Sequence, residues 1–340
     1  MQKSIFVVDD NAVNLAVAKD ALKEQYRVRT LPSAAKMFEM LTKFTPDLIL
    51  LDIEMPEMDG FEALSVLKEK ELTASIPVIF LTSITDEAVE AKGFQMGVID
   101  FISKPFSIPV LLNRIKTHLD IDEIIKERTA RLQNLQNALI FTLAEMVESR
   151  DQETGGHIER TSIYTRILLE EMQVSNVYEK ELKDIDIDLL ISSARLHDLG
   201  KVNVADALLN KPGKLTSDEF AAMQAHCENG EKIIDNILTR TDEVDLLLNA
   251  KLIAGSHHER WDGNGYPRGL RETDIPLQGR IASIVDVYDA LVSVRPYKKA
   301  YSCEEAIKII MENAGTQFDP QIADCLFRAK DRFEKVATNR

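Results

Sequence analysis

The chain of 340 residues is long enough for two domains, and its 45% hydrophobic and 29% charged residues are ordinary for a globular protein. Its net charge of −15 argues against a broad nucleic-acid-binding surface, but it is compatible with a small phosphorylated ligand in a locally basic pocket. The sequence has no apolar run long enough to span a membrane and no signal-peptide pattern, and its three cysteines lack metal or redox spacing, which indicates reduced cytoplasmic thiols.

The first 120 residues alternate short apolar runs with helical stretches. Five runs are predicted to be strands: residues 4–10, 26–30, 46–52, 76–82 and 100–106. Nearly continuous apolar strands separated by helices are typical of a parallel sheet covered on both faces. Since the carboxyl ends of parallel strands meet at one edge, we expect the polar residues near these ends to gather there. They are Asp9, Asp10, Asp52, Thr82 and Lys104.

Three carboxylates at one sheet edge repel each other unless a cation neutralises them, and oxygen ligands suit Mg²⁺. A metal beside a carboxylate, a lysine and a hydroxyl is a suitable arrangement for accepting a phosphoryl group. Lys104 can neutralise the added charge, and the Thr82 hydroxyl can donate to a phosphoryl oxygen. The alternative is that these residues are scattered strand-end caps.

Four segments resemble response-regulator receiver domains over about residues 1–120: DD at 9–10, LDIEMPEMDGFE at 51–62, LTS at 81–83 and KPF at 104–106. The resemblance implies a flavodoxin-like α/β fold with a five-stranded parallel sheet and a sensor histidine kinase as partner. It also implies roles for single residues: Asp52 as phosphoacceptor, Asp9 and Asp10 at Mg²⁺, Thr82 and Lys104 at the phosphoryl group, and Phe101 as switch aromatic.

Residues 108–149 are predicted to be helical. A heptad seam steps by three and four residues through Leu132, Leu135, Leu139, Thr142 and Met146. Two interpretations stay open: a helix packed on its own domain, or a connecting helix that pairs with its copy in a homodimer. We therefore divide the chain into a receiver at 1–120, a helical linker at 121–139 and a second domain at 140–340.

Beyond residue 150 the pattern is mostly helical, with loops predicted at 154–157, 210–216 and 262–269. The C-terminal stretch 331–340 is expected to be frayed.

Five of the six histidines fall within about 100 residues of this second region: His157, His197, His226, His257 and His258. Asp198 and Asp286 accompany them, and Glu153 precedes His157 by four, which would put both on one face of a helix. A single buried histidine is more often a core residue, but the set favours metal binding. Imidazole and carboxylate ligands suit Fe or Mn, with Ni or Zn as alternatives. Eight candidates exceed one ion's needs, so we expect two or three ions and phosphoester hydrolysis.

Five ordered segments resemble the HD-GYP phosphodiesterases, a branch of the HD hydrolase superfamily: RDQETGGHIERT (150–161), LHDLGK (196–201), QAHCENG (224–230), HHERWDGNGYPRG (257–269) and DVYDALVSVRPYKKA (286–300). The resemblance covers about residues 140–340 and implies an all-α domain that hydrolyses cyclic di-GMP to pGpG, GMP or both. The implied metal ligands are Glu153, His157, His197, Asp198, His226, His257, His258 and Asp286. Asp198 would bridge two ions.

The resemblance also implies substrate contacts. Lys201 and Asp198 would be catalytic, with Lys201 in contact with a phosphate, and Arg295 and Lys298 would bind the substrate's phosphates. A solvated helix end is the alternative for these last two. Gly263 allows close approach of a ligand, and Tyr266 would lie against a guanine or cap the site.

The leading hypothesis is a two-component response regulator whose output hydrolyses cyclic di-GMP under control of Asp52 phosphorylation. Its predicted partners are the kinase, a second copy through the linker helix, and diguanylate cyclase (GGDEF) domains, with no DNA and no membrane insertion. The alternatives are a catalytically weak protein that acts through protein–protein interaction and an HD hydrolase for other nucleotides.

Overall fold

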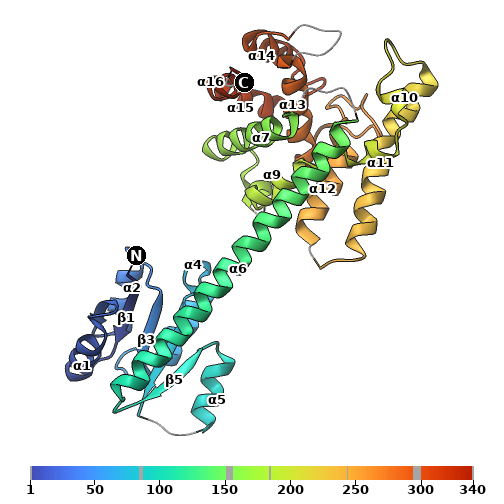
Figure 1. Ribbon diagram of the computed structural model, residues 1–340. Coiled ribbons are helices and arrows are strands. Elements are labelled where there is room, and N and C mark those ends of the chain that lie inside the picture. The colour runs from blue at the N-terminus through green and yellow to red at the C-terminus, as the bar shows by residue number, and fades with distance from the viewer. Residues whose placement is uncertain are drawn as a thin grey trace. The chain divides into compact units, whose positions relative to one another are not determined.

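The computed structural model describes residues 2–83, 87–150, 156–183, 185–242, 244–293 and 300–338. The chain divides into two compact units, Met1–Leu132 and Gln133–Arg340 (Figure 1). Every helix within the described residues is too short or too polar to cross a bilayer.

The first unit contains a five-stranded parallel sheet with strand order β2-β1-β3-β4-β5 (Figure 1). The strands are β1 (Ser4–Val8), β2 (Arg27–Leu31), β3 (Leu48–Asp52), β4 (Val78–Thr82) and β5 (Asp100–Ser103). All five predicted strands are confirmed. Because β1 and β3 are neighbours in this order, Asp9 and Asp52 come to the same edge of the sheet.

Helices cover both faces of this sheet. One face packs against α1 (Ala12–Leu22) and the first half of α6 (Ile108–Glu148), through Leu22 and Ile115 among others. The other packs against α2 (Ala34–Leu41), α3 (Gly60–Glu69) and α5 (Glu87–Gln95), and the short α4 (Glu71–Ala74) follows α3. All five residues of β3 are buried, which explains its unbroken apolar run.

The second unit is helical, and its described residues contain no strand. Its elements are the end of α6, α7 (His157–Val174), α8 (Glu179–Lys183), α9 (Ile187–Ala194), the 3₁₀ helix η1 (Leu199–Asn203), α10 (Asp206–Leu209), α11 (Ser217–Leu238), α12 (Val244–Ser256), the 3₁₀ helix η2 (Glu272–Asp274), α13 (Leu277–Val292), α14 (Cys303–Glu312), α15 (Pro320–Arg328) and α16 (Lys330–Thr338). The predicted combination of an α/β receiver and a helical second domain is confirmed.

The expectation of a frayed C-terminus is wrong for residues 331–338. Phe333 of α16 is fully buried, and its ring stacks on Tyr164 at a centroid distance of 4.9 Å and meets Tyr288 edge-on at 5.0 Å. An aromatic side chain of this size contributes enough buried area to hold a short terminal helix in place.

Helix α6 confirms the predicted helix of residues 108–149 almost to the residue. Within the second unit it packs through Ile140, Ala144 and Val147. The predicted heptad seam is a different face of the helix, because Leu135 and Leu139 on it are each more than half exposed. The seam is therefore free to contact another chain.

Candidate metal centre and phosphoacceptor site

In the first unit Asp9, Asp10 and Asp52 each place a carboxylate oxygen within 4.8 Å of the others. The Nζ atom of Lys104 lies 2.7 Å from both Asp9 Oδ2 and Asp52 Oδ2. Burial raises the pKa of Asp52, although the charge of Lys104 opposes the rise. Three acids with one lysine leave an excess of negative charge, which suits a hard divalent cation.

The residues expected to sense phosphorylation lie on the two strands beyond β3. Thr82 ends β4, whose Leu81 is in register with Asp52. Phe101 on β5 is buried, and its ring contacts Phe80 and Phe94 at centroid distances of 5.6 and 5.1 Å. The inward-facing Phe101 is thus part of the core of the sheet that carries Asp52.

In the second unit, seven of the eight predicted metal ligands form two clusters. One contains Asp198, His226, His257 and His258, and the other contains His157, His197 and Asp286. In each cluster the ligand atoms lie within 4.8 Å of one another. Glu153 lies outside the described residues, as do the predicted phosphate-binding residues Arg295 and Lys298. Helix α7 itself begins at His157, after Gly156.

Five elements supply these ligands. His157 opens α7, Asp286 lies on α13 and His226 on α11, while His257 and His258 follow directly after α12. His197 and Asp198 precede η1. A Cβ on Gly200 of η1 would lie 1.8 Å from the carbonyl oxygen of His226, so only glycine lets η1 pack this closely on α11. This contact brings the His197–Asp198 pair against His226.

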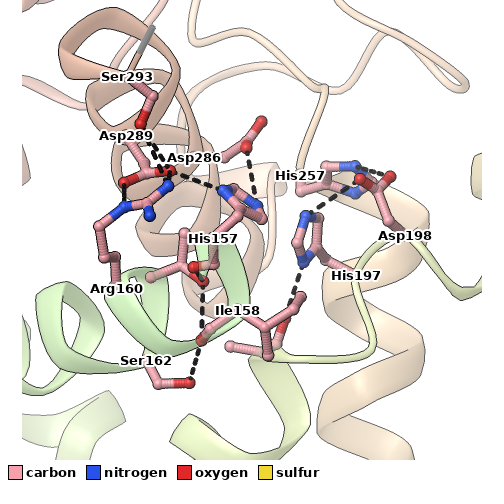
Figure 2. A network of polar contacts seen from close by, with 12 residues as sticks. His157, Ile158, Arg160, Ser162, His197, Asp198, His257, Asp286, Asp289 and Ser293 are labelled. Carbon is pink, nitrogen blue, oxygen red and sulfur yellow. Dashed lines mark hydrogen bonds and ion pairs between the residues drawn. The ribbon is translucent and has the colours of Figure 1, made fainter. Parts of the chain in front are cut away.

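Asp198 belongs to the first cluster and lies beside both His257 of that cluster and His197 of the other (Figure 2). Its Oδ1 is 3.5 Å from His226 Nε2 and 3.8 Å from His257 Nε2. Its Oδ2 is 3.2 Å from His197 Nε2 and 2.9 Å from Lys201 Nζ. One carboxylate therefore faces both groups of histidines, as a bridging ligand would.

The histidine rings are oriented for binding through Nε2. The Nδ1 atoms of His197, His226 and His257 lie 2.7–3.0 Å from backbone carbonyl oxygens. A carbonyl oxygen can only accept, so Nδ1 carries a proton and Nε2 is the ring atom that points into the cluster. Within the described residues, His157 Nε2, His197 Nε2 and Asp198 Oδ1 are buried without a hydrogen-bond partner. Buried polar atoms left in this way fit coordination to a cation.

Electrostatics differ between the clusters. Burial lowers the pKa of His226 and His258 and lowers that of His257 to about 3, which keeps these rings neutral. Burial also disfavours charge on His197, but Asp198 and Asp286 outweigh it and raise its pKa to about 9. Despite burial, the positive charge of Lys201 and His197 holds the pKa of Asp198 well below its usual range.

Two residues of this site were missed by sequence reasoning. Asp289 is buried, and its Oδ2 lies 2.8 Å from His157 Nδ1. Arg160 contacts both oxygens of the same carboxylate, at 2.7 and 2.8 Å (Figure 2). The available signal was spacing, because Asp289 follows Asp286 by three residues and shares its face of α13.

The loop after His258 carries Tyr266 to the clusters. Its ring centroid lies 4.7 Å from that of His258. Gly263 has a φ of +78°, and a Cβ on Gly265 would meet the backbone nitrogen of Arg260 at 2.3 Å. Both positions require glycine. Tyr266 thus lies beside the ligand cluster of His258, and its two expected roles, against a guanine or as a cap on the site, both stay predictions.

Glu259, to which sequence reasoning assigned no role, organises this loop. Its buried carboxylate accepts hydrogen bonds from the backbone nitrogens of Arg268 at 2.7 Å and Leu270 at 3.0 Å. Glu259 precedes Tyr266, and Arg268 and Leu270 follow it, so these hydrogen bonds join the two ends of the loop that carries Tyr266.

Comparison with known proteins finds a matching family model for each of the two units. The family model described as HD domain matches residues 141–322, and the response regulator receiver domain model matches residues 5–116. The chain is 39% identical to a probable cyclic di-GMP phosphodiesterase of Vibrio cholerae, over 99% of this chain and 80% of that protein. It is 35% identical to the cyclic di-GMP phosphodiesterase response regulator RpfG of Xanthomonas campestris, over 85% and 77%.

A further relative is the 3'3'-cGAMP-specific phosphodiesterase 2 of Vibrio cholerae, with 36% identity over 67% of this chain and 39% of that protein. The HD domain match spans more than half of the chain, and relatives align along most of both sequences. The chain therefore belongs to the HD domain family, among the response regulators that join a receiver domain to an HD domain.

Proposed function

We propose that this protein is a metal-dependent phosphodiesterase that hydrolyses cyclic di-GMP to pGpG, GMP or both. The observation that carries the proposal is the pair of ligand clusters, in which Asp198 of the first lies 3.2 Å from His197 of the second, with the Lys201 ammonium 2.9 Å from the same carboxylate. Relatives that align with most of the chain bear the name cyclic di-GMP phosphodiesterase.

The seven described ligands fit two divalent transition-metal ions. Asp198, His226, His257 and His258 would hold one, and His157, His197 and Asp286, with Asp198 shared, would hold the other. The mixture of imidazole and carboxylate favours Fe or Mn, with Ni or Zn as alternatives, and a third ion would involve Glu153. When bound, such ions polarise a phosphodiester and lower the pKa of water.

The protein's own side chains orient the substrate. Lys201 is held beside Asp198, where its charge can contact a non-bridging phosphate oxygen and stabilise the negative charge that develops there. Tyr266 and Gly263 would line one side of the substrate site, and Arg295 and Lys298 would bind the substrate's phosphates. The side-chain hydrogen bond to Asp289 holds the His157 ring in one orientation.

The test is turnover of cyclic di-GMP by protein purified without oxygen, together with its metal content. We expect hydrolysis, and we expect His197→Ala to lose nearly all of it, since the substitution removes a predicted metal ligand. His118→Ala is a matched control, because His118 is the one histidine of the first unit and pairs with Asp100. Full turnover by His197→Ala would exclude the proposed site.

Regulation is assigned to the receiver domain. We propose that a sensor histidine kinase phosphorylates Asp52 with Mg²⁺ held by the carboxylates of Asp9 and Asp10. The added charge would displace Lys104 from its present contacts with Asp9 and Asp52. Acetyl phosphate should change the turnover of the wild-type protein and leave that of Asp52→Asn unchanged; equal responses would exclude Asp52 as the control point.

A further inference from the structure

Arg150 forms an unusually dense set of contacts just after α6 ends. Its guanidinium donates to the backbone carbonyl oxygens of Lys201, Val202 and Val204, at 3.2, 2.9 and 2.9 Å. It also forms an ion pair with Asp206, with a nitrogen–oxygen distance of 2.7 Å. One side chain thus contacts the end of η1, the residue that follows it and the first residue of α10.

The main chain of Arg150 is tied to the same region. The Nδ2 atom of Asn210, at the end of α10, donates to the carbonyl oxygen of Arg150 at 3.0 Å and to that of Asp206 at 3.1 Å. The backbone nitrogen of Arg150 still donates to Val147 in the last turn of α6. Arg150 therefore joins the C-terminal end of α6 to the η1–α10 segment twice, as a donor through its side chain and as an acceptor through its carbonyl oxygen.

This segment carries the catalytic lysine. The backbone nitrogen of Lys201 donates to the carbonyl oxygen of Asp198, and that of Val204 donates to Lys201. A 3₁₀ helix of five residues has poor hydrogen-bond geometry and depends on outside contacts for a fixed conformation. On one side Gly200 packs against α11; on the other side the carbonyl groups are held by Arg150.

We propose that Arg150 is a positioning residue that fixes the backbone of Lys201 and so places its ammonium group at the substrate phosphate. The inference rests on the proposed phosphodiesterase function and deepens it. Arginine suits this role because its planar guanidinium has five donors and can bond several carbonyl oxygens at once. A lysine at position 150 would keep the charge and lose most of these bonds.

The experiment is a double-mutant cycle with Lys201. Arg150→Ala should lower kcat/KM by about 10- to 100-fold, since small misplacements of a catalytic group have effects of this size. In a Lys201→Ala background the same substitution should change kcat/KM by less than about threefold, because the side chain that it positions is gone. If the two single losses in kcat/KM multiply in the double variant, the two residues act independently and the proposal is overturned.

Metal content separates positioning from a general structural role. Asp198 is surrounded by histidines of other elements, so Arg150→Ala should retain the wild-type number of ions per chain. Loss of the ions would show a structural role for the whole site and would count against the proposal. Arg166→Ala is the control, because Arg166 also pairs with an aspartate, Asp188, but both side chains are largely exposed.

Arg150→Lys covers the case in which the alanine variant does not fold. The Arg150→Lys variant should fold, and its kcat/KM should lie between those of the wild type and Arg150→Ala. If its kcat/KM equals that of the wild type, the several bonds from Arg150 to carbonyl oxygens are not needed and the proposal is wrong. Each protein is assayed on cyclic di-GMP and on bis(p-nitrophenyl) phosphate. If the wild-type protein cleaves only the second compound, the proposed substrate is wrong, and the cycle on the generic diester still tests Arg150.

Discussion

Asp289 Oδ2 lies 2.8 Å from the Nδ1 atom of His157, although the two residues are 132 positions apart. The same carboxylate is held by Arg160 through two hydrogen bonds (Figure 2). Burial disfavours the ionised carboxylate, but Arg160 and His157 outweigh it and lower the pKa of Asp289. A carboxylate at Nδ1 fixes the imidazole tautomer and makes Nε2 a stronger ligand.

We predict that Asp289→Asn weakens metal binding at the His157 cluster by about 10- to 100-fold. The asparagine keeps the shape of the side chain and loses its charge. Competition with a chelator measures the affinity. Asp188→Asn, which alters an exposed Arg–Asp pair, should bind metal like the wild type. Equal affinities in the wild-type protein and Asp289→Asn would show that this carboxylate does not support a metal ligand.

The two clusters predict separable losses of metal. His157→Ala should remove the ion of its own cluster and retain the other, and His258→Ala should do the reverse, so each variant loses about one ion per chain. Asp198→Ala should weaken both sites, because Asp198 faces both clusters. Elemental analysis of the purified variants counts the ions. Complete loss of metal from His157→Ala would mean that the clusters are not independent.

The meeting of the acidic residues at the sheet edge and the gathering of seven candidate ligands could be predicted, because simple rules connect sequence to position. Parallel strands end at one edge, so Asp9 and Asp52 had to meet. Five clustered histidines in a chain with six are a compositional signal. Asp289 is marked only by its spacing from Asp286 on α13. Glu259 and Arg150 carry no such signal, because their partners are set by tertiary packing and no fixed spacing joins a charged residue to a distant carbonyl group.

Asp52 gives a prediction about stability and pH. Burial raises its pKa in the folded receiver, so the ionised form is disfavoured there relative to the unfolded chain. Asp52→Asn should therefore stabilise the receiver at pH 7. The gain should shrink as the pH falls through the raised pKa and vanish below about pH 4, where the unfolded aspartate is protonated as well.

Thermal unfolding of the full chain without Mg²⁺, followed between pH 4 and 8, measures this difference. Asp20→Asn removes an exposed carboxylate that pairs with Lys23, and it should leave the transition of the receiver unchanged. A lower melting temperature for Asp52→Asn at pH 7 would mean that Lys104 stabilises the ionised carboxylate more than burial penalises it.

The exposed seam of α6 predicts self-association. We expect the wild-type chain to be dimeric at micromolar concentration, and a Leu135→Lys/Leu139→Lys variant to be monomeric, because like charges on a coiled-coil seam repel. Light scattering after size-exclusion chromatography measures the mass. Leu248→Lys, at an exposed position of α12, should remain dimeric. A monomeric wild-type protein would show that the seam of α6 does not pair with a second copy of the chain.

Glu259 gives the sharpest prediction for the loop that carries Tyr266. Its two oxygens accept hydrogen bonds from Arg268 and Leu270, and the side chain is only 2% exposed. In Glu259→Gln one oxygen becomes an amide that can only donate, so it would face a backbone N–H group without an acceptor. Leaving one buried group unsatisfied costs about 1–3 kcal/mol.

We expect this cost to appear as a loosened loop, with KM for cyclic di-GMP raised by about tenfold, equivalent to about 1.4 kcal/mol, and kcat changed less. The reason is that Tyr266 lines the site beside His258 without being a metal ligand. Metal content should stay at the wild-type level. Glu304→Gln, in the exposed first turn of α14, is the matched control. If kcat falls and KM stays constant, Glu259 acts on the metal centre through His258 and not on the loop.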